Sequence, residues 1–406
     1  FLFLLCSILL PSQTWVGINS NDPKPMNIEM IESNVENTKI MFSMEGFHLI
    51  PTNDSKKFIV KTENGASLLI KGYPDLQKIS KSVIIPDASD MKVNIISFKY
   101  QDYENINIAP SKGNLTRDIN PNDVRYVYSD VYKNNEFYPS SISDLGDPYI
   151  LRDLRGQTVI FNPFQYNPVT KTLRAYSEIV VEVVTDGASN KNVINRDSNS
   201  LKIPSDYNEI YSSHFLNFEN DTRFAYLVDQ GNMLVISNSA FLSTMQPFVD
   251  WKNKRGVPTV MVSTSETGTS ATQIKNYITN YYNTNGLTFV LLVGDYAQVT
   301  SPLYNGSASD PSYGFISGND VYAEVIVGRF SGSTPNHIQT QVERSLDYEK
   351  RTDGDYYNNV AGFASNQGPG FNGFSDDQFN EYLWNTILSP YFYDTYYSEY
   401  DGSGGS

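Results

Sequence analysis

The sequence predicts two folding units, a β-rich N-terminal domain and a C-terminal α/β domain built on a doubly wound parallel sheet. Residues 27–184 consist of short apolar strands divided by turn residues, such as Asn-Gly at 64–65. From residue 232 onward, strand patterns alternate with helical patterns, an order that produces right-handed crossovers and a parallel sheet. The run TFVLLV at 288–293 shows no alternation, which is typical of a strand covered on both faces.

In the β-rich part, strands are expected within residues 59–70, 92–100 and 158–184. The last of these segments alternates, with Ile179, Val181 and Val183 on one face. One helical pattern, at 75–82, interrupts this part. Residues 185–222 are polar and lack a sustained period, so we expect them to form a linker between the domains.

In the α/β part, strands are expected at 232–237, 259–264, 288–293, 324–330 and 360–365. Helices are expected at 240–254, at 274–282, after the N-cap Thr334, and at 375–388. Gly256 and the pair Asn285-Gly286 are placed to end the first two helices. We expect no further strand after the last helix, and therefore a sheet that is cut off at its C-terminal side.

Composition limits the classes of partner. At about 100 to 200 residues per domain, 406 residues form two or three domains with real cores. The formal net charge of -15 argues against nucleic acid or an anionic membrane surface as a partner, because both select for basic patches.

The N-terminus, residues 1–17, is an apolar run followed by small and polar residues, and we interpret it as a truncated secretory signal. It lacks an initiator Met and a basic leading region, and the alternative is a buried strand or a short anchor. The run is too short to span a bilayer comfortably. Cys6 is the only cysteine, so the chain that remains after cleavage would carry no disulfide.

Two common types of site are not supported by the sequence. The residues after the first α/β strand, 238–241, contain no glycine, and no Walker-type loop is present, so a nucleotide site is not expected. His48, His214 and His337 are the only histidines, and none follows a strand. With no cysteine after Cys6 and no serine elbow, these residues do not supply a complete nucleophile and base pair.

Acidic residues near the third and fourth α/β strands form a candidate metal site. Asp320, Tyr322 and Glu324 alternate, so their side chains share one face on an extended backbone, and Asp295 follows the strand at 288–293. These three carboxylates, with the carbonyls of Ser317 and Tyr322, offer the oxygen ligands that calcium prefers. Spacing alone favours the alternative that they are solvated loop acids of an acidic protein.

Asp376 has two interpretations. Ser375 can act as the N-cap of the last helix with Gln378 at the third helical position, so Asp376 is explained by its favourable position at the helix N-terminus. A carboxylate at the base of a pocket would also pair with a cationic substrate side chain. The sequence by itself favours the capping role.

An ordered series of motifs runs through the chain: FVDWKNKRG at 248–256, TFVLLVGD at 288–295, YGFISGNDVYAEVIVGRF at 313–330, TQVERSLDYEK at 340–350 and FASNQGPGFNGFSDD at 363–377. These segments resemble the gingipain family of secreted bacterial cysteine peptidases, whose catalytic domain has a caspase-like three-layer α/β fold. Residues 109–119 and 149–168 resemble the gingipain propeptide. The resemblance covers most of the chain and implies three regions: a truncated signal peptide at 1–17, a propeptide with its linker at 18–223, and the N-terminal part of the catalytic domain at 224–406.

The resemblance also implies roles for single residues. It makes Asp295, Asp320 and Glu324, with the carbonyls of Ser317 and Tyr322, ligands of a structural calcium ion.

Asp376 stands where arginine-specific members keep the acid that pairs with the basic P1 side chain. Gln367 replaces their supporting Glu, so specificity stays open. Propeptide cleavage is expected between Arg223 and Phe224.

The family's catalytic His and Cys follow later strands, and we expect both beyond Ser406. The resemblance thus implies the zymogen of a calcium-binding cysteine endopeptidase that cuts protein or peptide substrates after basic residues, with arginine expected. Its own propeptide would act as intramolecular inhibitor, and its location would be secreted or at the bacterial surface. Two alternatives stay open: a related sortase or transpeptidase of a secretion system, and a surface-binding protein that has lost catalysis.

Overall fold

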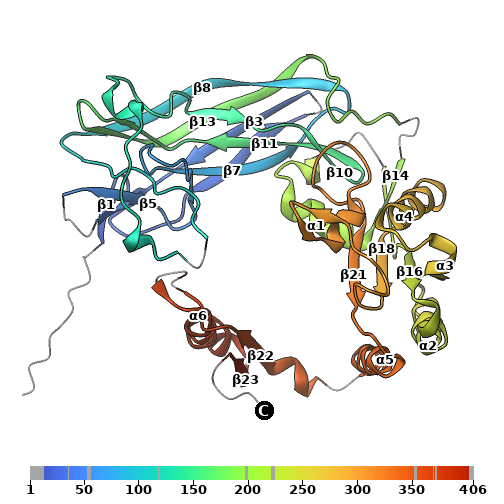
Figure 1. The fold of residues 1–406 in the computed structure, drawn as a ribbon. Coiled ribbons are helices and arrows are strands. Elements are labelled where there is room, and N and C mark those ends of the chain that lie inside the picture. The colour runs from blue at the N-terminus through green and yellow to red at the C-terminus, as the bar shows by residue number, and fades with distance from the viewer. Residues whose placement is uncertain are drawn as a thin grey trace, which may run out of the picture.

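The computed structural model describes residues 13–401 except 35, 53–55, 117–118, 197–199, 221–224, 352–353, 369 and 371–372. The expected cleavage position, Arg223 and Phe224, therefore lies outside the described residues, as do Cys6 and most of the expected signal. Figure 1 shows a β-rich half and an α/β half that meet near β10, α1 and β21. None of the described helices is long and apolar enough to cross a membrane.

The β-rich half consists of antiparallel sheets. Its strands are β1 (Thr14–Gly17), β2 (Asn27–Ser33), β3 (Asn37–Ser43), β4 (Gly46–Pro51), β5 (Phe58–Lys61), β6 (Ala66–Ser67), β7 (Gln77–Ile84), β8 (Ser89–Tyr103), β9 (Ser143–Leu145), β10 (Tyr149–Leu151), β11 (Leu154–Phe161), β12 (Phe164–Asn167) and β13 (Thr172–Ala188). The main sheets have the orders β10-β11-β7-β6 and β12-β13-β3-β2, and the smaller sheet has the order β1-β4-β5. One core cluster joins these sheets, and Ile179, Val181 and Val183 all lie in it as their alternation predicted.

Three expectations in this half need correction or comment. The helix predicted at 75–82 is wrong, because residues 77–84 form β7, which pairs antiparallel with β11. Leu76, Ile79 and Val83 have helix-like spacing, yet all contact the sheet core. The Asn-Gly turn does not close a hairpin, since β5 pairs with β4 and β6 pairs with β7. Residues 14–17, expected to belong to the signal, form β1 against β4.

The linker has more order than its polar composition suggested. Strand β14 (Ser200–Pro204) leads into helix α1 (Ser205–His214), and β14 pairs in parallel with β15 (Ala225–Asp229). Tyr207 and Tyr211 of α1 are buried against Tyr149, Leu151 and Leu154 of the β10–β11 hairpin. The linker is therefore held to both halves of the chain.

The α/β half contains a four-stranded parallel sheet with the order β17-β16-β18-β21. Its elements are β16 (Met233–Ser237), α2 (Leu242–Lys254), β17 (Thr259–Ser263), α3 (Thr264–Thr267), α4 (Ala271–Asn285), β18 (Phe289–Val293), β21 (Ile326–Phe330) and α5 (Pro335–Lys350). The two short strands β19 (Leu303–Tyr304) and β20 (Ser307–Ala308) form a separate pair before β21.

Helices cover both faces of this sheet. Leu234, Ile236 and Leu292 pack against Ile274 and Ile278 of α4. Val235, Leu291 and Val293 face the other way, toward α2 and α5. The alternation along β16 and β18 thus confirms the doubly covered strand predicted for 288–293, and the strand order places a topological switch between β16 and β18.

The last predicted strand does not join this sheet. In the described residues, β22 (Asn359–Ala364) pairs in parallel with β23 (Thr395–Tyr400) as a separate two-stranded sheet. Helix α6 (Asp376–Leu383) begins with the predicted capping box of Ser375 and Gln378, but it continues as a π-helical turn at Trp384–Leu388. Figure 1 shows α6, β22 and β23 apart from β16 and β18.

Candidate functional site

Asp295 lies at the carboxyl edge of the parallel sheet, beside the topological switch point between β16 and β18. Its backbone N–H donates to the Gly332 carbonyl at 3.0 Å, and its Oδ1 accepts from the Tyr296 N–H at 2.8 Å. Gly294 has φ +130°, and a Cβ there would lie 2.6 Å from the Cβ of Gln298. The chain can therefore turn sharply after β18 only with glycine at this position.

Asp320 and Glu324 lie at the opposite edge. Strand β18 pairs in parallel with β21, with Phe289 opposite Ile326. Glu324 lies before the start of β21, whereas Asp295 lies after the end of β18. The five-residue strands alone span roughly 16 Å at 3.3 Å per residue. Among the described residues, no group of three His, Cys, Asp or Glu side chains is placed to hold a metal ion. The expected convergence of Asp295 with the other two acids is therefore wrong, because parallel pairing separates them.

Glu324 is fully buried and only partly satisfied. Its Oε2 accepts from the backbone N–H groups of Ile316 at 2.6 Å and Ser317 at 2.9 Å, whereas its Oε1 is buried without a hydrogen-bond partner. Burial raises the pKa of Glu324 to about 7. A buried carboxylate oxygen with no donor has the chemistry of a cation ligand.

A lysine already lies close to this carboxyl group. Lys275 Nζ donates to the carbonyls of Ser312, Tyr313 and Phe315 at 2.9, 3.0 and 2.6 Å. Burial lowers the pKa of Lys275 to about 8, and the charge of Glu324 opposes this shift. The loop before β21 is thus folded around a half-buried lysine of the chain itself.

Asp320 is bound by the β-rich half. Its Oδ1 accepts from the Tyr322 N–H at 3.0 Å, and its Oδ2 accepts from the Ile150 N–H at 2.9 Å and from Asn192 Nδ2 at 3.2 Å. Asn192 Oδ1 in turn accepts from the Asn319 N–H at 2.8 Å. The predicted metal loop is therefore held by donors from residues 150 and 192, which sequence reasoning did not find.

The β10–β11 hairpin makes the second contact with the same loop. The rings of Tyr149 and Tyr322 stack with centroids 3.8 Å apart. Arg152, at the hairpin tip, donates from Nη1 to the carbonyls of Leu287 at 2.5 Å and Glu324 at 2.7 Å. No local pattern marked Arg152, because Leu287 and Glu324 lie more than a hundred positions away.

Asp376 lies at the N-terminus of α6, next to the end of β22. Its Oδ2 accepts from the Ser365 hydroxyl at 2.7 Å, and its backbone N–H donates to the Gln367 carbonyl at 2.9 Å. The structure therefore brings Asp376 and Gln367 together, the two positions that the family resemblance connects with specificity. The capping role of Ser375 is also present, so the two interpretations of Asp376 are compatible.

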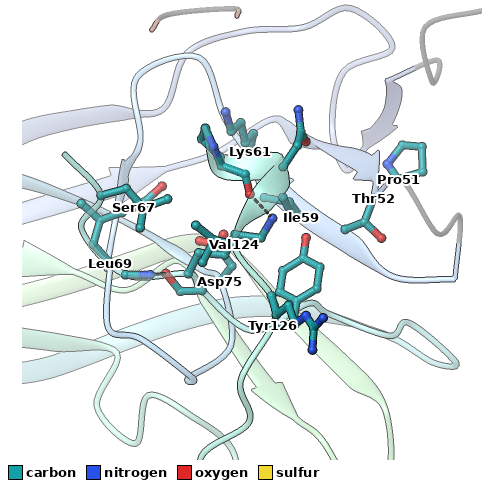
Figure 2. Close-up of a pocket in the computed structure, with 16 residues that line it drawn as sticks. Pro51, Thr52, Ile59, Lys61, Ser67, Leu69, Asp75, Val124 and Tyr126 are labelled. Carbon is teal, nitrogen blue, oxygen red and sulfur yellow. Dashed lines mark hydrogen bonds between the residues drawn. The ribbon is translucent and has the colours of Figure 1, made fainter. Parts of the chain in front are cut away.

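A cavity of about 650 Å³ lies far from these acids, inside the β-rich half. Figure 2 shows Lys61, Asp75 and Tyr126 among its lining side chains. Burial raises the pKa of Asp75, and the charge of Lys61 acts in the opposite direction.

The architecture is that of a two-part chain, in which a β-rich half is bound to the amino edge of an α/β sheet. Residues 19–226 match the family model Propeptide_C25, and residues 227–405 match Peptidase family C25. Gingipain R1 of Porphyromonas gingivalis is 35% identical over 410 residues, covering 98% of this chain and 41% of the relative. Gingipain R2 of the same species is 35% identical over 386 residues, covering 92% of this chain and 52% of the relative.

The chain is also similar to a more distant relative and to a solved structure. Lys-gingipain of Porphyromonas gingivalis is 25% identical over 310 residues, covering 69% of this chain and 17% of the relative. A solved complex of Porphyromonas gingivalis RgpB pro- and mature domains is 36% identical, with a TM-score of 0.43, and covers 47% of this chain and 97% of that chain. The chain belongs to the gingipain family, peptidase family C25, and spans about half or less of the length of these curated relatives.

Proposed function

We propose that this chain is the zymogen portion of a secreted cysteine endopeptidase that cleaves protein or peptide substrates after basic residues, with arginine preferred. The observation that carries the proposal is the uninterrupted order of a propeptide match and a C25 peptidase match, with 35% identity to Gingipain R1 along 98% of the chain. Identity to Lys-gingipain is lower, at 25%, which favours arginine over lysine.

Substrate recognition is assigned to Asp376. Its carboxylate would pair with the cationic P1 side chain by charge-assisted hydrogen bonds. Gln367, whose carbonyl accepts from the Asp376 N–H, would contribute a neutral amide beside it. The catalytic Cys and the His that assists thiolate formation are proposed to follow Ser406, on later strands of a caspase-like three-layer fold.

The β-rich half is proposed to be the inhibitory propeptide, at 18–223 after a signal at 1–17, with cleavage between Arg223 and Phe224. Strands β14 and β15, which flank this position, pair in parallel with each other. Cutting the chain between them therefore leaves the backbone hydrogen bonds of that pair in place. The processed propeptide would stay bound until further contacts are lost.

A structural calcium ion is also proposed, with Asp320, Glu324 and the carbonyls of Ser317 and Tyr322 as ligands. The partnerless Oε1 of Glu324 supports this assignment. Asp295, which the family resemblance adds to the ligands, lies at the other sheet edge, so we leave it outside the proposed shell. The ion would brace the loop before β21 by neutralising its two acids.

The experiment that tests the function uses the complete protein with matched peptide substrates that differ only in P1. We expect hydrolysis after Arg, slower hydrolysis after Lys, none after Ala, and complete loss of activity when thiols are alkylated. Hydrolysis that survives alkylation would rule out a cysteine peptidase. Transfer of the acyl group to an added amine, in place of hydrolysis, would indicate a transpeptidase.

A further inference from the structure

The tip of the β10–β11 hairpin is built to present one arginine. Leu151 pairs with Leu154, so the turn contains only Arg152 and Asp153. Arg152 has φ +51°, a left-handed conformation that favours glycine or asparagine and is costly for a long side chain. An unfavourable backbone conformation at a hairpin tip indicates that the side chain contributes compensating contacts.

Those contacts lie across the boundary between the two halves. The Arg152 side chain is only 8% exposed, and Nη1 bridges the carbonyls of Leu287 and Glu324. Its guanidinium lies over the ring of Tyr207 at 4.8 Å and over the ring of Tyr282 at 5.5 Å. Leu287, Glu324 and Tyr282 belong to the C25 peptidase part, and Tyr207 belongs to the propeptide part.

The charge of Arg152 is balanced within the propeptide itself. Asp153 Oδ2 lies 3.3 Å from Arg152 Nε and accepts from the Tyr211 hydroxyl at 2.8 Å. The peptidase part therefore contributes two carbonyls and an aromatic face but no countercharge. A guanidinium that is already paired can enter such a socket without leaving an uncompensated buried charge.

The socket lies at the amino edge of the parallel sheet. Leu287 precedes β18 and Glu324 precedes β21, so one guanidinium joins the starts of two neighbouring strands. Asp295 stands after β18, at the carboxyl edge where ligands of such sheets bind. The contacts that determine how tightly the propeptide binds thus lie at the opposite edge of the sheet from the one at which substrates are expected.

We infer that Arg152 is the residue that anchors the propeptide to the peptidase part after the connecting chain has been cut, through a socket formed by Leu287, Glu324 and Tyr282. This inference rests on the proposed zymogen function. The stack of Tyr149 on Tyr322 and the clamp of Asn192 on Asp320 lie beside the socket and extend the same interface. Loss of Arg152 weakens retention of the propeptide but does not unfold it.

The matched control is Arg174. It makes a bidentate pair with Asp102 and lies over the rings of Tyr100 and Phe137, so it resembles Arg152 in its contacts. All of these partners belong to the propeptide. Arg174→Ala therefore reports the cost of losing a comparable arginine without touching the interface.

The first measurement uses the intact chain and amide hydrogen exchange. The Ile326 N–H donates to the Thr288 carbonyl, directly beside the socket. Arg152→Ala should speed exchange at residues 287–288 and 324–326, whereas Arg174→Ala should not. If Arg152→Ala exchanges these amides at the wild-type rate, the anchoring role of Arg152 is refuted, whether or not the chain is cut at the boundary.

The second measurement follows the complete protein after processing, by size-exclusion chromatography and by the rate at which the propeptide dissociates. Arg152→Ala should raise this rate about 100-fold, as loss of a buried interfacial charge contact does. Arg152→Lys, which keeps the charge but loses the planar stacking, should give an intermediate rate, and Arg174→Ala the wild-type rate.

Tyr282→Ala probes the socket from the peptidase side and should also speed dissociation. Its effect should be smaller in the Arg152→Ala background, because the two side chains act through one contact. Equal dissociation rates for wild type and Arg152→Ala would refute the inference. Absence of any cut near Arg223 in the wild type would count against the proposed zymogen function, while the exchange measurement would still decide the anchor.

Discussion

Arg329 Nε donates to Asp310 Oδ2 at 2.7 Å, and Arg329 Nη2 donates to Asp310 Oδ1 at 2.7 Å, so the end of strand β21 is fixed to the loop that follows β18. The same guanidinium donates to the carbonyls of Gly294 and Val299. One arginine on a strand end therefore fixes the loop that carries Asp295. This pair therefore braces the carboxyl edge of the sheet.

The pair predicts a dependence of stability on acid. Burial by itself raises the pKa of Asp310, but hydrogen bonds from Arg329 and Ser301 bring it below the usual value. A depressed carboxyl pKa stabilises the folded state above the unfolded pKa of about 3.9, and this contribution is lost as pH falls through the lower folded pKa. When the melting temperature is plotted against pH between about pH 2 and 6, Asp310→Asn should reduce the slope on the acid side of the curve. A curve that keeps the wild-type slope would contradict the assignment. Asp347→Asn, which changes an exposed carboxylate on α5, is the control.

Arg155 should dominate the stability of the propeptide core. Its side chain is fully buried and donates to the carbonyls of Pro86, Ser89, Lys191 and Asn192 and to the Ser189 hydroxyl.

Replacing Arg155 with Ala leaves these acceptors without donors, so the free energy of unfolding should fall by about 3 kcal/mol or more in urea titration. Arg155→Lys should recover part of the loss. Lys133→Ala, which removes an exposed surface pair with Asp130, should leave the urea midpoint unchanged.

Asp376→Asn should separate recognition from catalysis. In the complete enzyme we expect kcat/KM for Arg substrates to fall by at least about 30-fold, because a charge-assisted pair with the P1 side chain is lost. The value for a neutral P1 should change little. Asp377→Asn, one position along the same helix, serves as the control, and an equal loss on charged and neutral substrates would exclude the recognition role.

Calcium should raise the melting temperature of the full chain if the loop at 317–324 binds it, since a ligand of the native state stabilises it by mass action. Asp320→Asn and Glu324→Gln should each abolish the rise. Asp295→Asn should retain it, because the structure places Asp295 at the opposite edge of the sheet. Loss of the calcium response in Asp295→Asn would show that the loop rearranges to join the two edges.

Much of the α/β half was predictable because its signals are local. The apolar run at 288–293, the N-cap Thr334 and the capping box of Ser375 with Gln378 depend on neighbouring residues, and each has the predicted conformation. The segment at 77–84 was mispredicted for the converse reason. Its apolar spacing fits a helix, and only pairing with β11, more than 70 positions away, makes it a strand.

The sequence predicted which residues form the candidate site but not where those residues lie relative to one another. In the α/β half, the sequence by itself determined the order of most strands and helices, the helix ends and the acids that follow particular strands, because periodicity and capping act within a few residues.

Only the tertiary structure decided that Asp295 and Glu324 occupy opposite edges and that Arg152 enters a socket 172 positions away at Glu324. Parallel register and domain docking arise from packing between distant segments, and such packing leaves no periodic trace in either segment.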